Sequence, residues 1–160
     1  MCEFGQPMTV ENLDIAAPGP GEVSVQVKAC AICHSDILYA CGACGGELPA
    51  VYGHEAAGVV ETVGAGVSHV QPGDHVVVTL VRSCGCCGCC DQGFYGSCES
   101  GFALDQNPPL RLSAAGSLVT HGLGTTAFDE LISGRYQLTE INAAIAAVER
   151  GEALRNVIVF

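Results

Sequence analysis

The sequence predicts a mainly β protein with a few helices, built as a small β-barrel or sandwich that carries loops. The first reason is that short runs of β-branched residues are separated by turns rich in Gly and Pro. The second is that apolar and polar residues alternate after the first such turn, in the period of a half-buried strand. With 160 residues, 49% of them apolar, the chain is long enough for one globular unit with a core.

The first predicted strand follows the Pro/Gly turn at 18–21. There Val23, Val25 and Val27 alternate with polar residues, which is the period of a half-buried strand. Another β-branched run follows in GHEAAGVVETVGAGV (53–67), and the turn 71–74 leads into HVVVTLV. The segment HSDILYA, residues 34–40, is also strand-like and contains no glycine.

The last residues predict one helix followed by one strand. Thr139 is the expected N-cap, and Gly151 is expected at the C-cap. One apolar stripe runs along the helix between them: Ile141, Ile145 and Val148. VIVF, residues 157–160, then closes the chain as a strand.

The charge balance excludes two classes of partner. The chain has 17 acidic and 6 basic residues, a formal charge of −11, and no Lys/Arg cluster. Binding to nucleic acid or to an anionic membrane surface needs basic residues, so we expect neither. The first residues form no signal-peptide pattern, and nowhere does an apolar run approach the roughly 20 residues that cross a bilayer. We therefore expect a soluble, cytoplasmic protein.

The cysteine spacing predicts a metal site. Cytosolic thiols stay reduced, so a regular cysteine cluster there more often binds metal than forms disulfides. Cys84, Cys87, Cys90 and Cys98 make C-x2-C-x2-C-x7-C. Four thiolates with no open position favour a structural zinc, which holds a loop together and does no chemistry. An iron-sulfur cluster and an unliganded loop stay as alternatives, as does a register in which Cys86 or Cys89 replaces a neighbour.

A second metal site is suggested by Cys33 and His54, a thiolate and an imidazole of the kind zinc prefers. Asp36 could accept a hydrogen bond from the other ring nitrogen of His54, and Glu55 could approach the metal. Two ligands alone predict weak, partial occupancy. An alternative set, C-x2-C-x7-C-x2-C, would join Cys30 and Cys33 to Cys41 and Cys44 in a four-sulfur site.

These motifs together resemble the zinc-dependent alcohol dehydrogenases of the medium-chain dehydrogenase/reductase superfamily. The resemblance rests on ICHSD, on the four-cysteine spacing and on the signature G-H-E-x-x-G-x5-G-x2-V, which this sequence matches from Gly53 to Val67. It implies a GroES-like β-barrel with a Cys-rich zinc lobe at about 82–100. It also implies a small alcohol or aldehyde as substrate, primary or aromatic, and NAD(P) as hydride acceptor.

The resemblance also assigns roles to individual residues. Cys33 and His54 correspond to catalytic zinc ligands, with Glu55 as the acid beside them. Ser35 corresponds to the hydroxyl that binds the alcohol and starts a proton relay, while Asp36 corresponds to the partner of the zinc-binding histidine. His34 occupies the position of a contact to the cofactor pyrophosphate. In such enzymes zinc polarises the alcohol oxygen, and hydride passes to the nicotinamide.

The sequence departs from the family in two respects. No cysteine follows Cys98, although the family takes its third catalytic ligand from a cysteine beyond the barrel, and no G-x-G-x-x-G occurs. We interpret residues 1–128 as the catalytic domain and 129–160 as its C-terminal helix and strand, joined across a deleted nucleotide-binding domain. We expect such a chain to be inactive alone and to associate, for instance as a homo-oligomer, through newly exposed apolar surface. The alternative is a zinc-binding barrel module without turnover.

Overall fold

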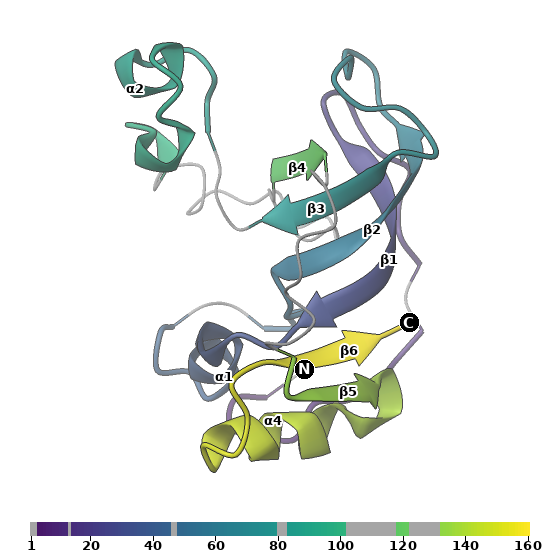
Figure 1. Cartoon of the computed structure of the whole chain (residues 1–160), viewed down its shortest axis with the longest axis vertical. Helices are drawn as coiled ribbons and strands as arrows, with labels where there is room; N and C mark the ends of the chain where they lie inside the picture. The colour runs from purple at the N-terminus through teal and green to yellow at the C-terminus, as the bar shows by residue number, and fades with distance from the viewer. Residues whose placement is uncertain (1–2, 13, 46–47, 80–82, 102–117, 122–131) are drawn as a thin grey trace.

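One sheet of six strands forms the body of the protein (Figure 1). The computed structural model describes residues 3–12, 14–45, 48–79, 83–101, 118–121 and 132–160. The strand order is β4-β3-β2-β1-β6-β5, and every neighbouring pair is antiparallel except β5 with β6. The strands are β1 (Val23–Ala31), β2 (Glu55–Val63), β3 (His75–Thr79), β4 (Leu118–His121), β5 (Gly134–Gln137) and β6 (Asn156–Val159).

The predicted fold class, mainly strands with a few helices, is confirmed. The helices are α1 (His34–Ala40), α2 (Gly88–Asp91) and α4 (Ile141–Glu149), with 3-10 turns η1 (Tyr95–Ser97) and η3 (Leu138–Glu140). Over the described residues the sheet is open and not a closed barrel, because β4 and β5 each pair on one side only. The predicted junction between residues 128 and 129 lies outside the described residues.

Residues 34–40 form helix α1, so the prediction of a strand-like segment was wrong. Cys33 is the N-cap residue, and its backbone N–H donates to the Asp36 carboxylate at 2.9 Å. An acidic side chain three positions into a helix satisfies a backbone donor that the helix leaves free, and so it favours a helix start here. Ile37 and Ala40, one turn apart, are both buried.

The C-terminal helix was predicted correctly, but its N-cap was not. Thr139 lies inside the 3-10 turn η3, which precedes α4. Gln137 starts that turn, and its backbone N–H donates to the Glu140 carboxylate at 2.8 Å, so the capping contact forms two residues earlier. At the other end Arg150, and not Gly151 as predicted, is the C-cap residue; Gly151 follows it with φ +69° and donates its N–H to the Val148 carbonyl oxygen. Glycine ends the helix because a left-handed residue is required there.

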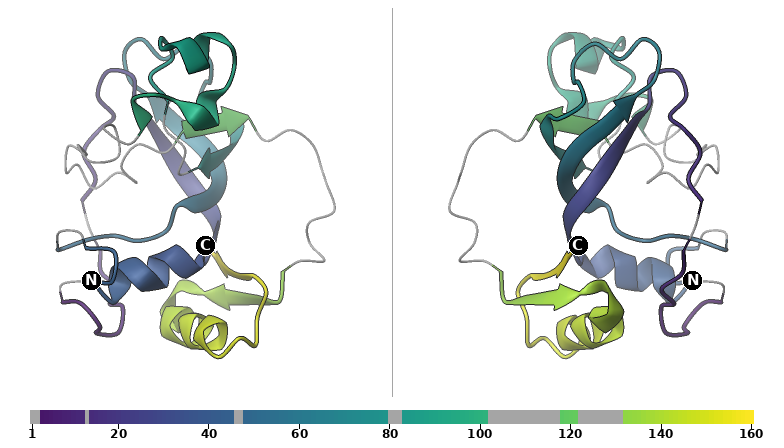
Figure 2. Two further views of the ribbon diagram at one scale, coloured as in Figure 1. Left: turned by 90° about the vertical axis from the view of Figure 1, so that its left-hand side faces the viewer. Right: turned by 90° about the vertical axis from the view of Figure 1, so that its right-hand side faces the viewer.

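Two apolar clusters stabilise the two ends of the sheet. In the first, α4 packs over β5 and β6 (Figure 2), and its predicted stripe packs, together with Ala144 of the same helix, against Ile32 and Ile158. Asn156 is buried beneath α4, where its amide donates to the Ala144 carbonyl oxygen at 2.9 Å. The second cluster consists of valines only: Val60, Val70 and Val76, with Val23, Val25, Val63 and Val67 around them.

Two glycines of the G-H-E signature occupy points where backbone segments approach closely. A β-carbon on Gly58 would overlap the carbonyl oxygen of Gln26 across the β1–β2 pair, and one on Gly64 would overlap that of Gly19. Gly64 also donates its N–H to the Glu22 carbonyl oxygen at 2.8 Å, which holds the two segments together. These glycines are therefore required by packing.

We expect Gly64→Ala to lower the free energy of unfolding by about 1–3 kcal/mol, because the added methyl group meets rigid backbone. Urea denaturation followed by circular dichroism measures the change. Gly96→Ala is the matched control, since nothing lies within 4 Å of a β-carbon there and its φ is not positive. Equal stability of the two variants would contradict the packing account.

Candidate metal centres

The four cysteines predicted to bind a structural metal lie together in one lobe. The sulfur atoms of Cys84, Cys87, Cys90 and Cys98 are all within 4.8 Å of one another. Cys87 and Cys98 are 4.0 Å apart, close to the roughly 3.8 Å between two sulfurs of a tetrahedral zinc site. The lobe, with α2 and η1, stands apart from the sheet (Figure 1). The donors present therefore fit a zinc ion.

Backbone N–H groups prepare two of these sulfurs to bind a cation. Those of Cys86 and Cys87 hydrogen-bond the Cys84 sulfur and lower its pKa to about 6. The N–H of Cys84 in turn donates to the Cys98 sulfur at 3.3 Å. Burial acts in the opposite direction on Cys90, which is 4% exposed, and raises its pKa to about 12. A cation is needed for all four to be thiolates together.

The other cysteines of the chain lie outside this group. Cys86 is exposed, and neither Cys86 nor Cys89 belongs to the set whose sulfurs converge. Cys41 and Cys44 are exposed beyond α1, and the Cys41 thiol donates to the Leu38 carbonyl oxygen at 3.3 Å. The alternative set with Cys30 and Cys33 does not converge within the described residues.

The second candidate centre is assembled by the register of β1 and β2. Ala31 pairs with Glu55, so Cys33, just beyond the end of β1, lies beside His54, just before β2 begins. A sulfur of Cys33, a ring nitrogen of His54 and a carboxylate oxygen of Glu55 lie within 4.8 Å of one another. Three side chains thus offer donors at this point, where the motifs taken alone offered two.

Hydrogen bonds fix which nitrogen of His54 faces the cluster. Its Nδ1 lies 3.0 Å from Asp36 Oδ1, and Asp36 is only 6% exposed. Nδ1 therefore carries the proton of the neutral ring, and Nε2 is left as a donor atom for a metal. The Ser35 hydroxyl oxygen lies 3.2 Å from both His54 Nε2 and the Cys33 sulfur.

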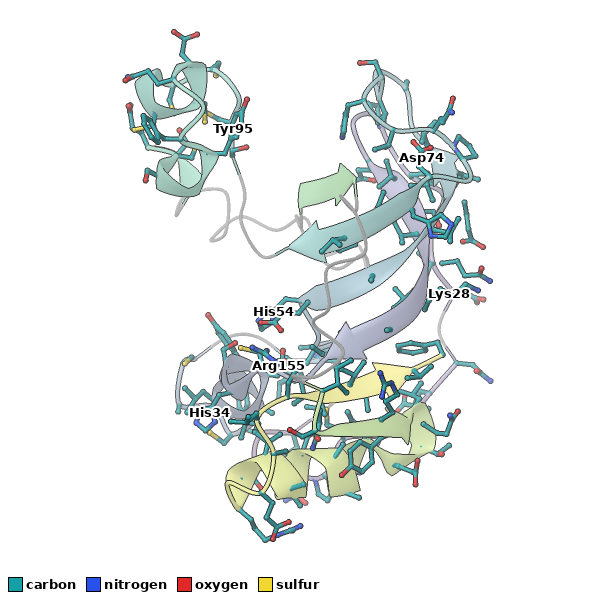
Figure 3. All side chains as sticks on the ribbon, in the orientation of Figure 1. Lys28, His34, His54, Asp74, Tyr95 and Arg155 are labelled. Carbon is teal, nitrogen blue, oxygen red and sulfur yellow. The ribbon has the colours of Figure 1, made fainter. Side chains whose placement is uncertain are left out.

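Arg155 belongs to the second centre, although the sequence analysis did not identify it. Its Nη1 lies 2.5 Å from Glu55 Oε2, and both side chains are partly exposed. Arg155 precedes β6, and Figure 3 shows it at the same end of the sheet as His54. One signal was available: this is one of only 6 basic residues in a chain with 17 acids. A guanidinium beside a possible ligand carboxylate competes with a metal for it.

His34, predicted to contact the cofactor pyrophosphate, is exposed on the first residue of α1. It takes no part in either group of converging donors. Helix α1 has seven residues, and Asp36 places a carboxylate in its first turn. A carboxylate at a helix N-terminus repels an added anion, so little here favours a phosphate apart from the imidazole itself.

The fold agrees with comparisons to known proteins. The family described as alcohol dehydrogenase GroES-like domain matches residues 19–135. The chain belongs to this family.

Named relatives give the same assignment. The chain is 46% identical to putative alcohol dehydrogenase D of Mycobacterium tuberculosis over 104 residues, 65% of the chain and 28% of that protein. With alcohol dehydrogenase class-3 of Drosophila melanogaster it shares 34% over 147 residues, 88% of the chain and 39% of the relative. A crystal structure of an alcohol dehydrogenase zinc-binding domain protein from Burkholderia ambifaria superposes with TM-score 0.63 at 37% identity, over 77% of this chain and 32% of that one.

The chain therefore spans about a third of the length of the relatives it matches. It is homologous to alcohol dehydrogenases through their GroES-like domain, and the family and the cysteine cluster together imply zinc. Among the described residues, the helices are all too short or too polar to cross a membrane.

We expect Cys87→Ser to remove about one equivalent of zinc and to loosen the lobe, because a three-sulfur site holds the ion less tightly. Elemental analysis of the purified variants measures the metal. Cys86→Ser and Cys89→Ser are the matched controls and should keep the wild-type stoichiometry. Loss of zinc in those variants, with retention in Cys87→Ser, would show that a different set of cysteines binds it.

Proposed function

We propose that this chain is a zinc-binding catalytic domain of the alcohol dehydrogenase type that is not active by itself. The observation that carries the proposal is the convergence of Cys33, His54 and Glu55 beside the Ser35 hydroxyl, in a chain of this family. A thiolate, an imidazole and a carboxylate are three protein donors that leave a fourth position for an oxygen ligand, as catalytic zinc sites do.

Each residue of this centre has a chemical task in the proposal. Cys33, His54 and Glu55 would hold the ion, and Asp36 keeps His54 in the tautomer that directs Nε2 at it. A zinc ion held by these residues would polarise the oxygen of a bound alcohol and favour loss of its proton. The Ser35 hydroxyl, 3.2 Å from two of the donor atoms, would be placed to hydrogen-bond the oxygen of the alcohol.

Weak occupancy is expected because Glu55 has a competing partner. The sequence left this centre with two firm ligands, and the structure adds the Glu55 carboxylate as a third. That carboxylate is paired with Arg155, however, whose charge also repels a divalent cation. Binding of metal through Glu55 would require the ion pair to loosen.

We expect Arg155→Gln to tighten metal binding at this centre about tenfold, because it frees the Glu55 carboxylate and removes a positive charge. Titration with Co²⁺ after zinc has filled the cysteine lobe reports the second centre by its absorption. Arg150→Gln is the matched control, since Arg150 pairs with Glu152 on the exposed surface. His54→Ala should abolish the signal. Weaker binding in Arg155→Gln would mean that Arg155 positions Glu55 instead of competing for it.

The chain's residues do not fit a dinucleotide cofactor. The sequence contains no G-x-G-x-x-G, the turn that lets a backbone approach a pyrophosphate at a helix N-terminus. His34 is one exposed imidazole, and a single hydrogen bond to a charged group is worth about 1.5–3 kcal/mol. Micromolar binding needs about 8 kcal/mol. We derive no hydride-transfer step for this chain alone.

The sheet supports the proposal that residues 1–128 and 129–160 are parts of one domain. β6 pairs with β1, and its neighbour β5 pairs with β6, so the C-terminal segment completes the sheet that the first segment begins. In the proposal these parts are joined across a deleted nucleotide-binding domain. A nucleotide-binding partner would then have to be supplied separately for alcohol oxidation by NAD(P).

We expect the zinc-containing chain to show no NAD-dependent oxidation of benzyl alcohol or ethanol, because nothing holds the nicotinamide carbon within about 3–3.5 Å of the carbinol carbon. Absorbance of the reduced cofactor measures turnover, and Cys33→Ser is the control. Turnover above that control would contradict the proposal and would mean that the chain or a partner supplies the nucleotide site.

A further inference from the structure

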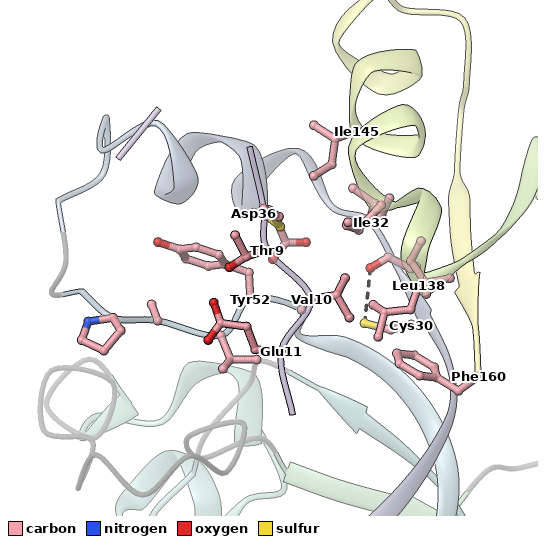
Figure 4. A pocket seen from close by; sticks show the side chains of 18 residues that line it. Thr9, Val10, Glu11, Cys30, Ile32, Asp36, Tyr52, Leu138, Ile145 and Phe160 are labelled. Atoms are coloured by element: carbon pink, nitrogen blue, oxygen red, sulfur yellow. Dashed lines mark hydrogen bonds between the residues drawn. The ribbon is translucent and has the colours of Figure 1, made fainter. Parts of the chain in front are cut away.

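A cavity of about 420 Å³ lies between the N-terminal segment and the C-terminal helix, and Asp36, the partner of His54, is part of its wall. The N-terminal segment at Met8 to Glu11 crosses one side of it (Figure 4). The opposite wall comes from the end of β1, from η3 and α4 and from β6. This volume is within the range of pockets that bind small molecules in proteins.

The N-terminal segment is held over the cavity by a paired contact with α4. The Met8 N–H donates to the Asn142 side-chain oxygen at 2.8 Å, and the Asn142 amide donates to the Met8 carbonyl oxygen at 3.0 Å. Residues 7–12 belong to no strand or helix, so this segment is not part of the sheet. The cavity is therefore a covered pocket with a partly open side.

Most polar side chains of the pocket gather on one side, where Val10 also lies, and the other side is mainly apolar. Figure 4 shows Thr9, Glu11 and Tyr52 on one side and, facing them, an apolar group. That group includes Ile32, Leu138, Ile145 and Phe160. Such a pocket suits an amphiphile, with its chain among the apolar side chains and its head group near the mouth.

The charges of the pocket select the head group. Glu11 and Asp36 are its only ionisable carboxyls, and none of the described lining residues is Lys, Arg or His. Asp36 is already engaged, with its two oxygens on His54 and on the Cys33 N–H. Glu11 is exposed and makes no hydrogen bond or ion pair among the described residues. A cationic head group would be attracted to it, and an anionic one repelled.

We propose that this pocket binds a primary alkylammonium compound with a short aliphatic chain. The chain occupies the apolar end near Leu138 and Phe160, and the ammonium group lies at the mouth beside Glu11. The proposed head-group contact, Glu11, belongs to neither group of converging metal donors, so the test does not depend on the function proposed above.

Calorimetric titration of the zinc-containing chain with octylamine, hexylamine and octanoate tests the proposal. We expect one octylamine to bind per chain. Its affinity should be roughly tenfold higher than that of hexylamine, because octylamine buries two more methylene groups. Octanoate should bind more weakly than octylamine. Affinity that does not depend on chain length, or octanoate that binds as tightly as octylamine, would overturn the proposal.

Two matched pairs of variants locate the binding. Glu11→Gln should weaken octylamine three- to fivefold, whereas Glu149→Gln, on the exposed face of α4, should not. Leu138→Gln should weaken it through the chain, whereas Leu154→Gln, 87% exposed and away from the pocket, should not. An equal loss of octylamine affinity in both variants of a pair would mean that the amine binds nonspecifically to the acidic surface. Circular dichroism checks that each variant keeps its fold.

Discussion

The pairing of β6 with β1 is the interaction on which the rest of the structure depends. Residues about 130 positions apart are joined in it, with Ala29 opposite Val159 and Ala31 opposite Val157. The Ile32 N–H donates to the Asn156 carbonyl oxygen at 2.9 Å, and the Phe160 N–H donates to the Lys28 carbonyl oxygen at 3.1 Å. This contact closes a long loop, which is entropically costly. Burial of Ile32 and Ile158 against Ala144 of α4 helps to offset that cost.

The same pairing determines the chemistry of the second metal centre. β1 carries Cys33 at its end, and its register with β2 sets His54 and Glu55 beside that cysteine. β6 then brings Arg155 to Glu55 from a position 100 residues later in the chain. Segments next to three strands, β1, β2 and β6, thus form this candidate centre. Arg155, just before β6, pairs with the Glu55 carboxylate and so controls whether it can bind a metal. Loss of β6 would remove Arg155 and would also expose the side of β1 that supports Cys33.

The sequence was most informative where a function depends on local spacing. The four cysteines of the lobe converge as their spacing predicts, because two-residue spacers leave little freedom in a short turn. Arg155 could not be identified in this way, since its partner is set by strand order and not by a motif. Residues 34–40 were misread because their composition suits strand or helix. A single side-chain contact, Asp36 to the Cys33 N–H, favours the helix.

The lobe and the sheet are stabilised by different interactions. Neither apolar cluster of the described residues includes a residue of the lobe, and its aromatic residues Phe94 and Tyr95 are 62% and 50% exposed. A segment with so little buried apolar surface needs another source of folding free energy, and a metal bound by four thiolates would supply it. Burial raises the pKa of the Cys90 thiol to about 12, and a cation beside it would favour the thiolate. The lobe should therefore fold with its metal, while the sheet folds with its apolar clusters.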